Sequence, residues 1–439
     1  MKPNDLLSFQ VTAADLRKSC ALKGLDFESS NDIPSPEKRV GQQRAVDAIE
    51  LGLQISDDGH NIFVLGTSGS NRHGLVEELV DERASAQSAS DDWCYVNNFI
   101  DPEQPRHLRF PPGRGTEFAN KMRSLVSDLQ MAIPAAFEGD DYRAQLKAIE
   151  DETQKEVESR SKQLEERARK ENIAVLQTPT GYVLAPVRDG KVMDEEEFSK
   201  QSEEFRETTK AAIERLSDEL RNHIEEMPEI RKRHRERVKA LNRQITEHAV
   251  GVSLGELIEQ YRDLAEVVTY LDNVRSDIVE NADDFQSTGT PSLPFMQQDT
   301  ESTFARYDVN LLISNDPKGP APVVYESNPN YGNILGKIEH RAEMGALVTD
   351  FRMIRPGALH AANGGYLILD IRRVLTRPFV WEALKQALFA KQLRIESPGE
   401  TYGFVSTTTL RPQPIPLNVK VILIGERWLY HLLAMYDLS

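Results

Sequence analysis

Residues 355–370 read RPGALHAANGGYLILD, and this stretch decides the fold. After two glycines, the residues from Tyr366 to Leu369 form an unbroken apolar run of strand length, which ends at Asp370. A short strand that is apolar on both faces is typical of a parallel sheet covered by helices on both sides. An acid at the end of such a strand holds magnesium in many nucleotide-binding sheets. Asp370 is therefore our candidate metal ligand.

Short apolar runs and helical patterns alternate along much of the remaining sequence. This alternation predicts an α/β fold in which the later strands share one parallel sheet. The strand-like runs lie at 61–65, 93–96, 309–313, 365–369 and 419–424, and the helical patterns lie at 75–80, 116–131, 379–391 and 427–436.

The loop after the first of these strands is the candidate phosphate-binding loop, because a strand feeding a helix amino end presents free backbone N–H groups to phosphate. It consists of Gly66, Thr67, Ser68, Gly69, Ser70, Asn71, Arg72, His73 and Gly74. Compared with the pattern G-x-x-x-x-G-K-[ST], only Gly66 matches. Asn71, Arg72 and His73 stand where the second glycine, the lysine and the hydroxyl residue belong.

The three departures differ in their chemical consequence. Asn tolerates a left-handed backbone, and Arg can pair with phosphate. Imidazole in place of a hydroxyl is the more damaging change, because magnesium prefers oxygen ligands. The loop therefore predicts ATP with magnesium as a cofactor whose binding is weak or lost, and an ordinary strand-to-helix turn is the alternative.

Residues 140–285 have a different composition, in which Glu, Lys, Arg and Gln dominate. This pattern predicts two long helices of coiled-coil type. Strand and turn residues between Ile173 and Gly190 interrupt them and predict a small β-hairpin at their tip. The charged helices are interpreted as a solvated face, with a partner-binding arm as the alternative.

The overall composition excludes several classes of protein. The 439 residues include 53 basic and 70 acidic side chains, a net charge of −17, which disfavours binding to nucleic acid or to an anionic membrane. The only cysteines, Cys20 and Cys94, exclude a disulfide scaffold and a zinc cluster, and we expect both to be buried thiols. Without a signal-like or 18-residue apolar stretch, we expect a cytoplasmic protein with no membrane partner.

The stretch at 355–370 resembles the segment leading into the second nucleotide motif of AAA+ ATPases, and most closely that of Lon-type proteases of the B and C subclasses. The resemblance implies a ring-forming, ATP-driven module that engages protein substrates and feeds them to a serine peptidase chamber. It extends to Gly41–Ala45, Tyr95–Phe99, Asn328–Glu339 and Pro378–Lys385, and to a strand pair expected at 394–396 and 405–410.

Two departures from this family pattern limit what it implies. Ile371 follows Asp370 where many P-loop ATPases carry the glutamate that polarises water, and members of the C subclass also have weak or absent ATPase motifs. The sequence stops at Ser439, so the arginine finger, the helical lid and the Ser-Lys peptidase domain have no counterpart in it. We therefore expect no peptidase residues in this chain.

The expected organisation is an AAA+-like α/β core divided by the helical insertion. Its parts are an amino-terminal arm at 1–40, core segments at 41–139 and 303–439, the insertion at 140–285 and a linker at 286–302. The function expected from the resemblance is the ATPase and substrate-engaging module of a Lon-like protease, with a homo-oligomeric ring in the intact family and a peptidase in another chain left open. The alternative is a non-enzymatic scaffold that binds a protein partner through the insertion.

Overall fold

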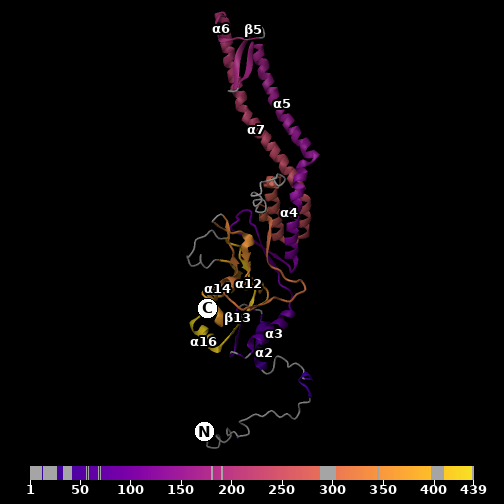
Figure 1. The fold of residues 1–439 in the computed structure, drawn as a ribbon, viewed down its shortest axis with the longest axis vertical. Helices are drawn as coiled ribbons and strands as arrows, with labels where there is room; N and C mark the ends of the chain where they lie inside the picture. The colour runs from indigo at the N-terminus through magenta and orange to yellow at the C-terminus, as the bar shows by residue number, and fades with distance from the viewer. Residues whose placement is uncertain are drawn as a thin grey trace.

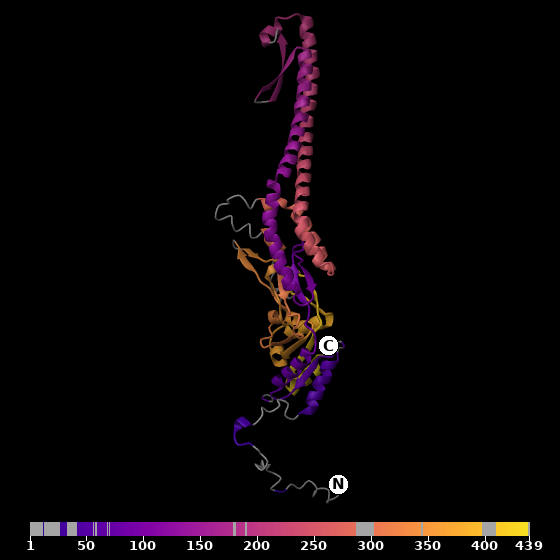
Figure 2. The same cartoon turned by 90° about the vertical axis from the view of Figure 1, so that its right-hand side faces the viewer.

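The structure is a computed structural model, and it describes residues 12, 27–32, 42–55, 57, 59–67, 69, 71–178, 181–188, 191–286, 303–343, 346–396 and 410–437. Figures 1 and 2 show an elongated molecule, with an α/β region at one end and a long helical arm at the other. Within these residues, none of the helices is both long enough and apolar enough to cross a membrane.

The centre of the α/β region is a four-stranded sheet in which every neighbouring pair is parallel. The strand order is β1 (Ile62–Leu65), β16 (Lys420–Gly425), β13 (Tyr366–Asp370) and β8 (Val323–Glu326). The strands come from both ends of the sequence, so the sheet closes around the helical insertion. This topology confirms the expected α/β fold class with a helical insertion.

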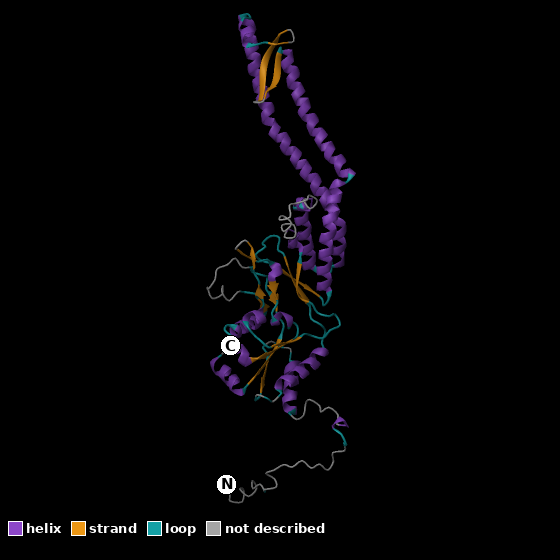
Figure 3. Ribbon diagram, in the orientation of Figure 1, coloured by secondary structure: helices purple, strands orange, loops and turns teal. Residues whose placement is uncertain are grey.

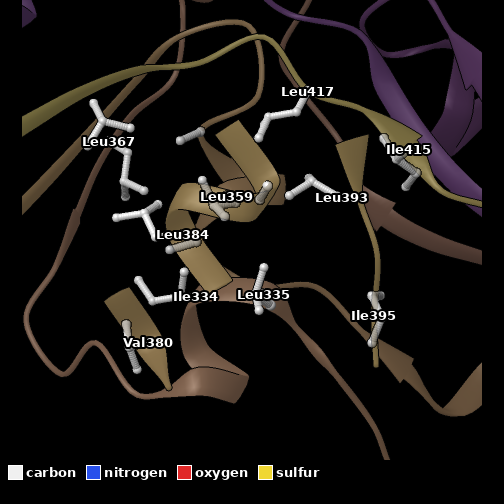
Figure 4. Close-up of a cluster of buried hydrophobic side chains, with 14 of the residues drawn as sticks. Ile334, Leu335, Leu359, Leu367, Val380, Leu384, Leu393, Ile395, Ile415 and Leu417 are labelled. Carbon is white, nitrogen blue, oxygen red and sulfur yellow. The ribbon is translucent and has the colours of Figure 1, made fainter. Parts of the chain in front are cut away.

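Helices cover both faces of this sheet. Successive side chains of β13 point to opposite faces, so each side chain shows which helices lie on its side. Tyr366 and Ile368 pack with α2 (Gln43–Gln54) and α3 (Arg72–Ser85), whose buried residues include Ile49 and Leu79. Leu367 and Leu369 belong to the cluster on the other face, which Figure 4 shows in part. The helices contributing to that second cluster are α11 (Tyr331–Leu335), α12 (Ala358–Ala361), α13 (Ile371–Leu375), α14 (Val380–Ala390) and α16 (Arg427–Tyr436).

A second sheet is antiparallel and corrects one sequence prediction. Its order is β3 (Arg106–Phe110), β2 (Asp92–Val96) and β7 (Val309–Ile313), so the strand at 309–313 lies outside the parallel sheet. The apolar run identified a strand, but its sequence does not specify a pairing partner. β3 was not predicted, because it lies in a proline-rich stretch.

Five helices build the arm and its base (Figure 3): α4 (Arg114–Glu138), α5 (Asp140–Lys170), α7 (Glu203–Gln260), α8 (Ala265–Glu280) and α9 (Ala282–Gln286). At 58 residues, α7 is about 87 Å long. At the base, α4, α7 and α8 share an apolar core with the antiparallel sheet. Further out, ion pairs join α5 to α7, including Glu156–Arg233 at 2.9 Å and Glu152–Arg237 at 2.7 Å.

The predicted hairpin is present at the far end of the arm. It consists of β4 (Ile173–Thr178), β5 (Gly181–Arg188) and the short β6 (Lys191–Val192), followed by α6 (Glu195–Ser199). It packs against the outer ends of α5 and α7 (Figure 1).

The remaining elements are short, and one of them replaces a predicted strand pair. Residues 394–396 are not in a strand, and 405–409 lie outside the described residues, as does nearly all of the expected linker at 286–302. The described ladder instead joins β14 (Gln392–Leu393) to β15 (Ile415–Pro416). The others are η1 (Ser30–Asp32), η3 (Ala305–Tyr307), β9 (Lys337–Ile338), β10 (Arg341–Glu343), β11 (Ala346–Val348), η4 (Phe351–Met353) and β12 (Ile354–Arg355).

Candidate functional site

The predicted loop lies at the carboxyl edge of the parallel sheet, between β1 and α3. Gly69 has a φ of 85°, and Asn71, which precedes the helix, has φ 51° and ψ 28°. Both are left-handed conformations, which glycine and asparagine adopt more readily than other residues. Asn71 makes no side-chain hydrogen bond to the first turn of α3. Ser68 and Ser70 lie outside the described residues.

Arg72, at the lysine position of the loop pattern, turns back onto the sheet. Its guanidinium donates hydrogen bonds to the carbonyl oxygens of Gly66 and Gly425, the latter at 3.2 Å. These carbonyls lie at the carboxyl ends of the adjacent strands β1 and β16. The cation that the pattern assigns to phosphate therefore holds two strand ends together.

His73 and Asp370 face each other beside this contact. His73 Nε2 lies 3.9 Å from Asp370 Oδ2, which is too long for a hydrogen bond, and Nε2 is a buried atom without a hydrogen-bond partner. The rings of His73 and Tyr325 also make a T-shaped contact, with ring centroids 5.9 Å apart. The other oxygen of Asp370 caps α13 by accepting hydrogen bonds from the backbone N–H groups of Arg372 and Arg373 at 3.0 and 3.2 Å.

Ile371 is fully buried at the start of α13, at the position where many P-loop ATPases carry a glutamate. It packs so closely on Gly425 that a Cβ atom there would clash with its side chain. The residue after Asp370 thus belongs to the hydrophobic core instead of facing a ligand. Among the described residues, no group of three or more His, Cys, Asp or Glu side chains forms a metal site.

These residues are not arranged to bind ATP and magnesium as a G-x-x-x-x-G-K-[ST] loop does. The lysine substitute is used on backbone carbonyls, an imidazole stands at the hydroxyl position, and the residue after Asp370 is aliphatic. The structure brings Gly66, Arg72, His73 and Asp370 to one edge of the sheet, as the carboxyl ends of parallel strands require.

Sequence reasoning missed two participants in this site, Tyr325 at the end of β8 and the carbonyl of Gly425. Neither belongs to a motif. The strand order could have indicated Gly425, because β16 is the immediate neighbour of β1.

Residues 357–363, which precede β13, contact other parts of the core. His360 is 2% exposed, its Nδ1 accepts a hydrogen bond from the Gly357 N–H at 3.3 Å, and burial lowers its pKa to about 4. Asn363 donates to the Pro416 carbonyl and accepts from the Asn418 N–H, both at 2.8 Å. These contacts join the turn before β13 to the segment before β16.

Two family models match parts of this chain. One, described as "LonB-like, AAA domain", matches residues 319–439, which contain β8, β13, β16 and Asp370. The other, described as "Lon-like LonC helical domain", matches residues 92–125, which contain β2, β3 and the first half of α4.

Two curated proteins share short segments with the chain. A putative Lon protease homolog of Escherichia coli strain K12 is 37% identical over 79 residues, which are 17% of this chain and 12% of that protein. The archaeal Lon protease of Archaeoglobus fulgidus is 31% identical over 100 residues, 22% of this chain and 15% of that protein. The matched segments thus span less than a sixth of either relative.

Proposed function

We propose that this chain, which is related to the Lon-type proteases, is the substrate-engaging AAA+ module of a Lon-like protease and works without hydrolysing ATP. The AAA domain match supports a module of the ATPase type. The names of the relatives support a role in protein degradation.

The observation that carries the loss of hydrolysis is the position of Arg72. Its guanidinium bonds to the carbonyls of Gly66 and Gly425, so a bound phosphate would have to displace hydrogen bonds that join β1 to β16. We propose that ATP with magnesium binds at Gly66–Gly74 and Asp370 only weakly. The buried Ile371 supports the same conclusion, since it cannot polarise water.

The proposed partners are unfolded protein segments and further copies of this chain in a ring, with a peptidase in the same assembly. The net charge of −17 argues against nucleic acid as the main partner. We place this function in the cytoplasm, as the sequence composition led us to expect.

A second candidate function, a scaffold that binds a protein partner through its helical insertion, is favoured by the construction of the arm. Between base and tip, α5 and α7 are joined by exposed ion pairs such as Arg160–Glu226 and Arg237–Glu152. Exposed pairs of this kind contribute little to stability. An arm of this length with so little apolar packing in its middle is suited to presenting its tip at a distance.

Two assays on the purified chain separate these functions. The first measures ATP turnover with magnesium against the Asp370→Ala variant, and the second measures binding of a fluorescently labelled, permanently unfolded protein with and without ATP. The proposal expects turnover equal to that of the variant and polypeptide binding that ATP does not change. Turnover that Asp370→Ala abolishes would contradict loss of hydrolysis, and an absence of polypeptide binding would favour the scaffold.

A further inference from the structure

The tip hairpin is the least charged part of an otherwise highly charged arm. Residues 172–187, NIAVLQTPTGYVLAPV, contain no Asp, Glu, Lys, Arg or His, although 28% of the chain is charged. Charged residues resume directly at Glu171 and Arg188. Figure 2 shows the hairpin running back along the arm and diverging from the helices.

One face of the hairpin explains its attachment to the arm. Ile173 is 2% exposed and packs in a cluster with Leu164 of α5 and Leu216 of α7. Val175 and Leu184, which are directly opposite each other in the ladder, pack against the same cluster. This face anchors the hairpin to the helices.

The other face carries apolar side chains that the arm does not cover. Leu176 and Val183 are also cross-strand partners, and they are 38% and 47% exposed. Val192 in β6, which pairs with Val187 of β5, is 46% exposed on this same face. Solvent-facing positions of a hairpin are usually polar, so an exposed apolar pair here indicates a binding surface.

The hairpin also offers backbone groups for pairing. β4 is an edge strand of the order β4-β5-β6. An edge strand presents a row of N–H and C=O groups that can pair with an extended peptide, and alternate side chains then meet the neighbouring face. Natural edge strands are commonly protected by charged residues, and the described part of β4 has none.

We propose that β4 and the exposed pair Leu176 and Val183 capture extended, uncharged segments of unfolded polypeptide by strand addition. This inference rests on the proposed substrate-engaging function and assigns its first contact to the hairpin. The absence of charged residues on this surface favours an uncharged occupant. A charged segment would lose hydration without gaining an ion pair here, whereas the side chains of an apolar segment have no such hydration to lose. Its N–H and C=O groups complete the ladder.

The test uses a labelled ten-residue peptide of alternating valine and serine, with capped ends, and follows its fluorescence anisotropy on the full chain. A second peptide has the same sequence with every other backbone nitrogen methylated, which blocks strand pairing. The hairpin variant is Leu176→Thr with Val183→Thr, because threonine keeps the preference for strands while adding polarity. The control variant is Ile224→Thr with Val252→Thr, at positions of α7 that are 48% and 64% exposed.

Strand capture predicts that the hairpin variant and the methylated peptide each weaken binding tenfold or more, and that the control variant stays within twofold. Hydrogen exchange at residues 173–188 checks that the hairpin is folded in its variant. Equal binding by wild type and hairpin variant would overturn this inference while leaving substrate engagement intact, and so would an unaffected methylated peptide. No binding by wild type, or self-association through the hairpin in its place, would overturn both.

Discussion

Arg72 and Gly425 are separated by 353 positions in the sequence, yet the guanidinium of Arg72 donates a hydrogen bond to the Gly425 carbonyl at 3.2 Å. The same guanidinium bonds to Gly66, so one side chain links the carboxyl ends of β1 and β16. These strands belong to segments on opposite sides of the helical insertion. The loop between β1 and α3 is thus part of the connection between the two halves of the core.

Replacing Arg72 by alanine should lower the stability of the core. Hydrogen bonds from a charged donor contribute about 1.5–3 kcal/mol, so the free energy of unfolding in urea should fall by about that amount. The control is Arg262→Ala, which removes an exposed ion pair with Glu259 on α7 and should change stability by less than about 0.5 kcal/mol. Equal effects of the two substitutions would show that Arg72 is not a structural link.

His360 should make the stability of the core depend on pH. Burial lowers its pKa from 6.5 to about 4. Between pH 6.5 and pH 4, His360 is therefore protonated in the unfolded chain and neutral in the folded chain. Stability from this residue is complete above pH 6.5 and is lost as the pH falls toward 4, by about 3 kcal/mol in total.

Urea unfolding at pH 7.5, 6.5, 5.5 and 4.5 measures this dependence. His360→Asn keeps an acceptor near the Gly357 N–H and removes the titrating group. Unfolding of this variant should take up about one proton fewer than unfolding of wild type, so its free energy of unfolding should fall less steeply as the pH is lowered. A variant whose pH profile parallels that of wild type would contradict the assignment.

Leu216 should hold the tip of the arm together. Its side chain is 2% exposed in the cluster that anchors the hairpin, and a buried Leu→Ala substitution costs about 2–5 kcal/mol. Hydrogen exchange in Leu216→Ala should accelerate at residues 164–168 and 173–188 and stay unchanged in β13 and β16. Ile224→Ala, on the same helix at 48% exposure, is the matched control and should leave all of these segments protected. Faster exchange throughout the core would contradict an independently anchored tip.

Periodicity and apolar runs predicted the elements well where local sequence decides them. The runs expected at 365–369 and 419–424 form the adjacent parallel strands Tyr366–Asp370 and Lys420–Gly425, and the helices expected at 379–391 and 427–436 lie close to those bounds. The hairpin at the tip was predicted from its turn residues. Pairing depends on distant segments, which is why the strand at 309–313 was assigned to the wrong sheet.

The candidate site was predictable in its position but not in its contacts. The loop and Asp370 meet because parallel strands place their carboxyl ends at one edge. The orientation of Arg72 depends on carbonyls in β1 and β16, and the burial of Ile371 depends on its contact with Gly425. Such contacts arise from the packing of β16, which no local pattern near residue 72 records.

Restoring the loop tests most directly whether Arg72 serves as a structural contact in the α/β core in place of a nucleotide ligand. Isothermal titration with ATP and magnesium should compare wild type with the variant Asn71→Gly, Arg72→Lys and His73→Thr, whose loop matches the phosphate-binding pattern at 66–73. Binding should be at least tenfold tighter in the restored variant, and this gain should be lost when Asp370→Ala is added. Wild type that binds ATP as tightly as the restored variant would contradict a structural role for Arg72.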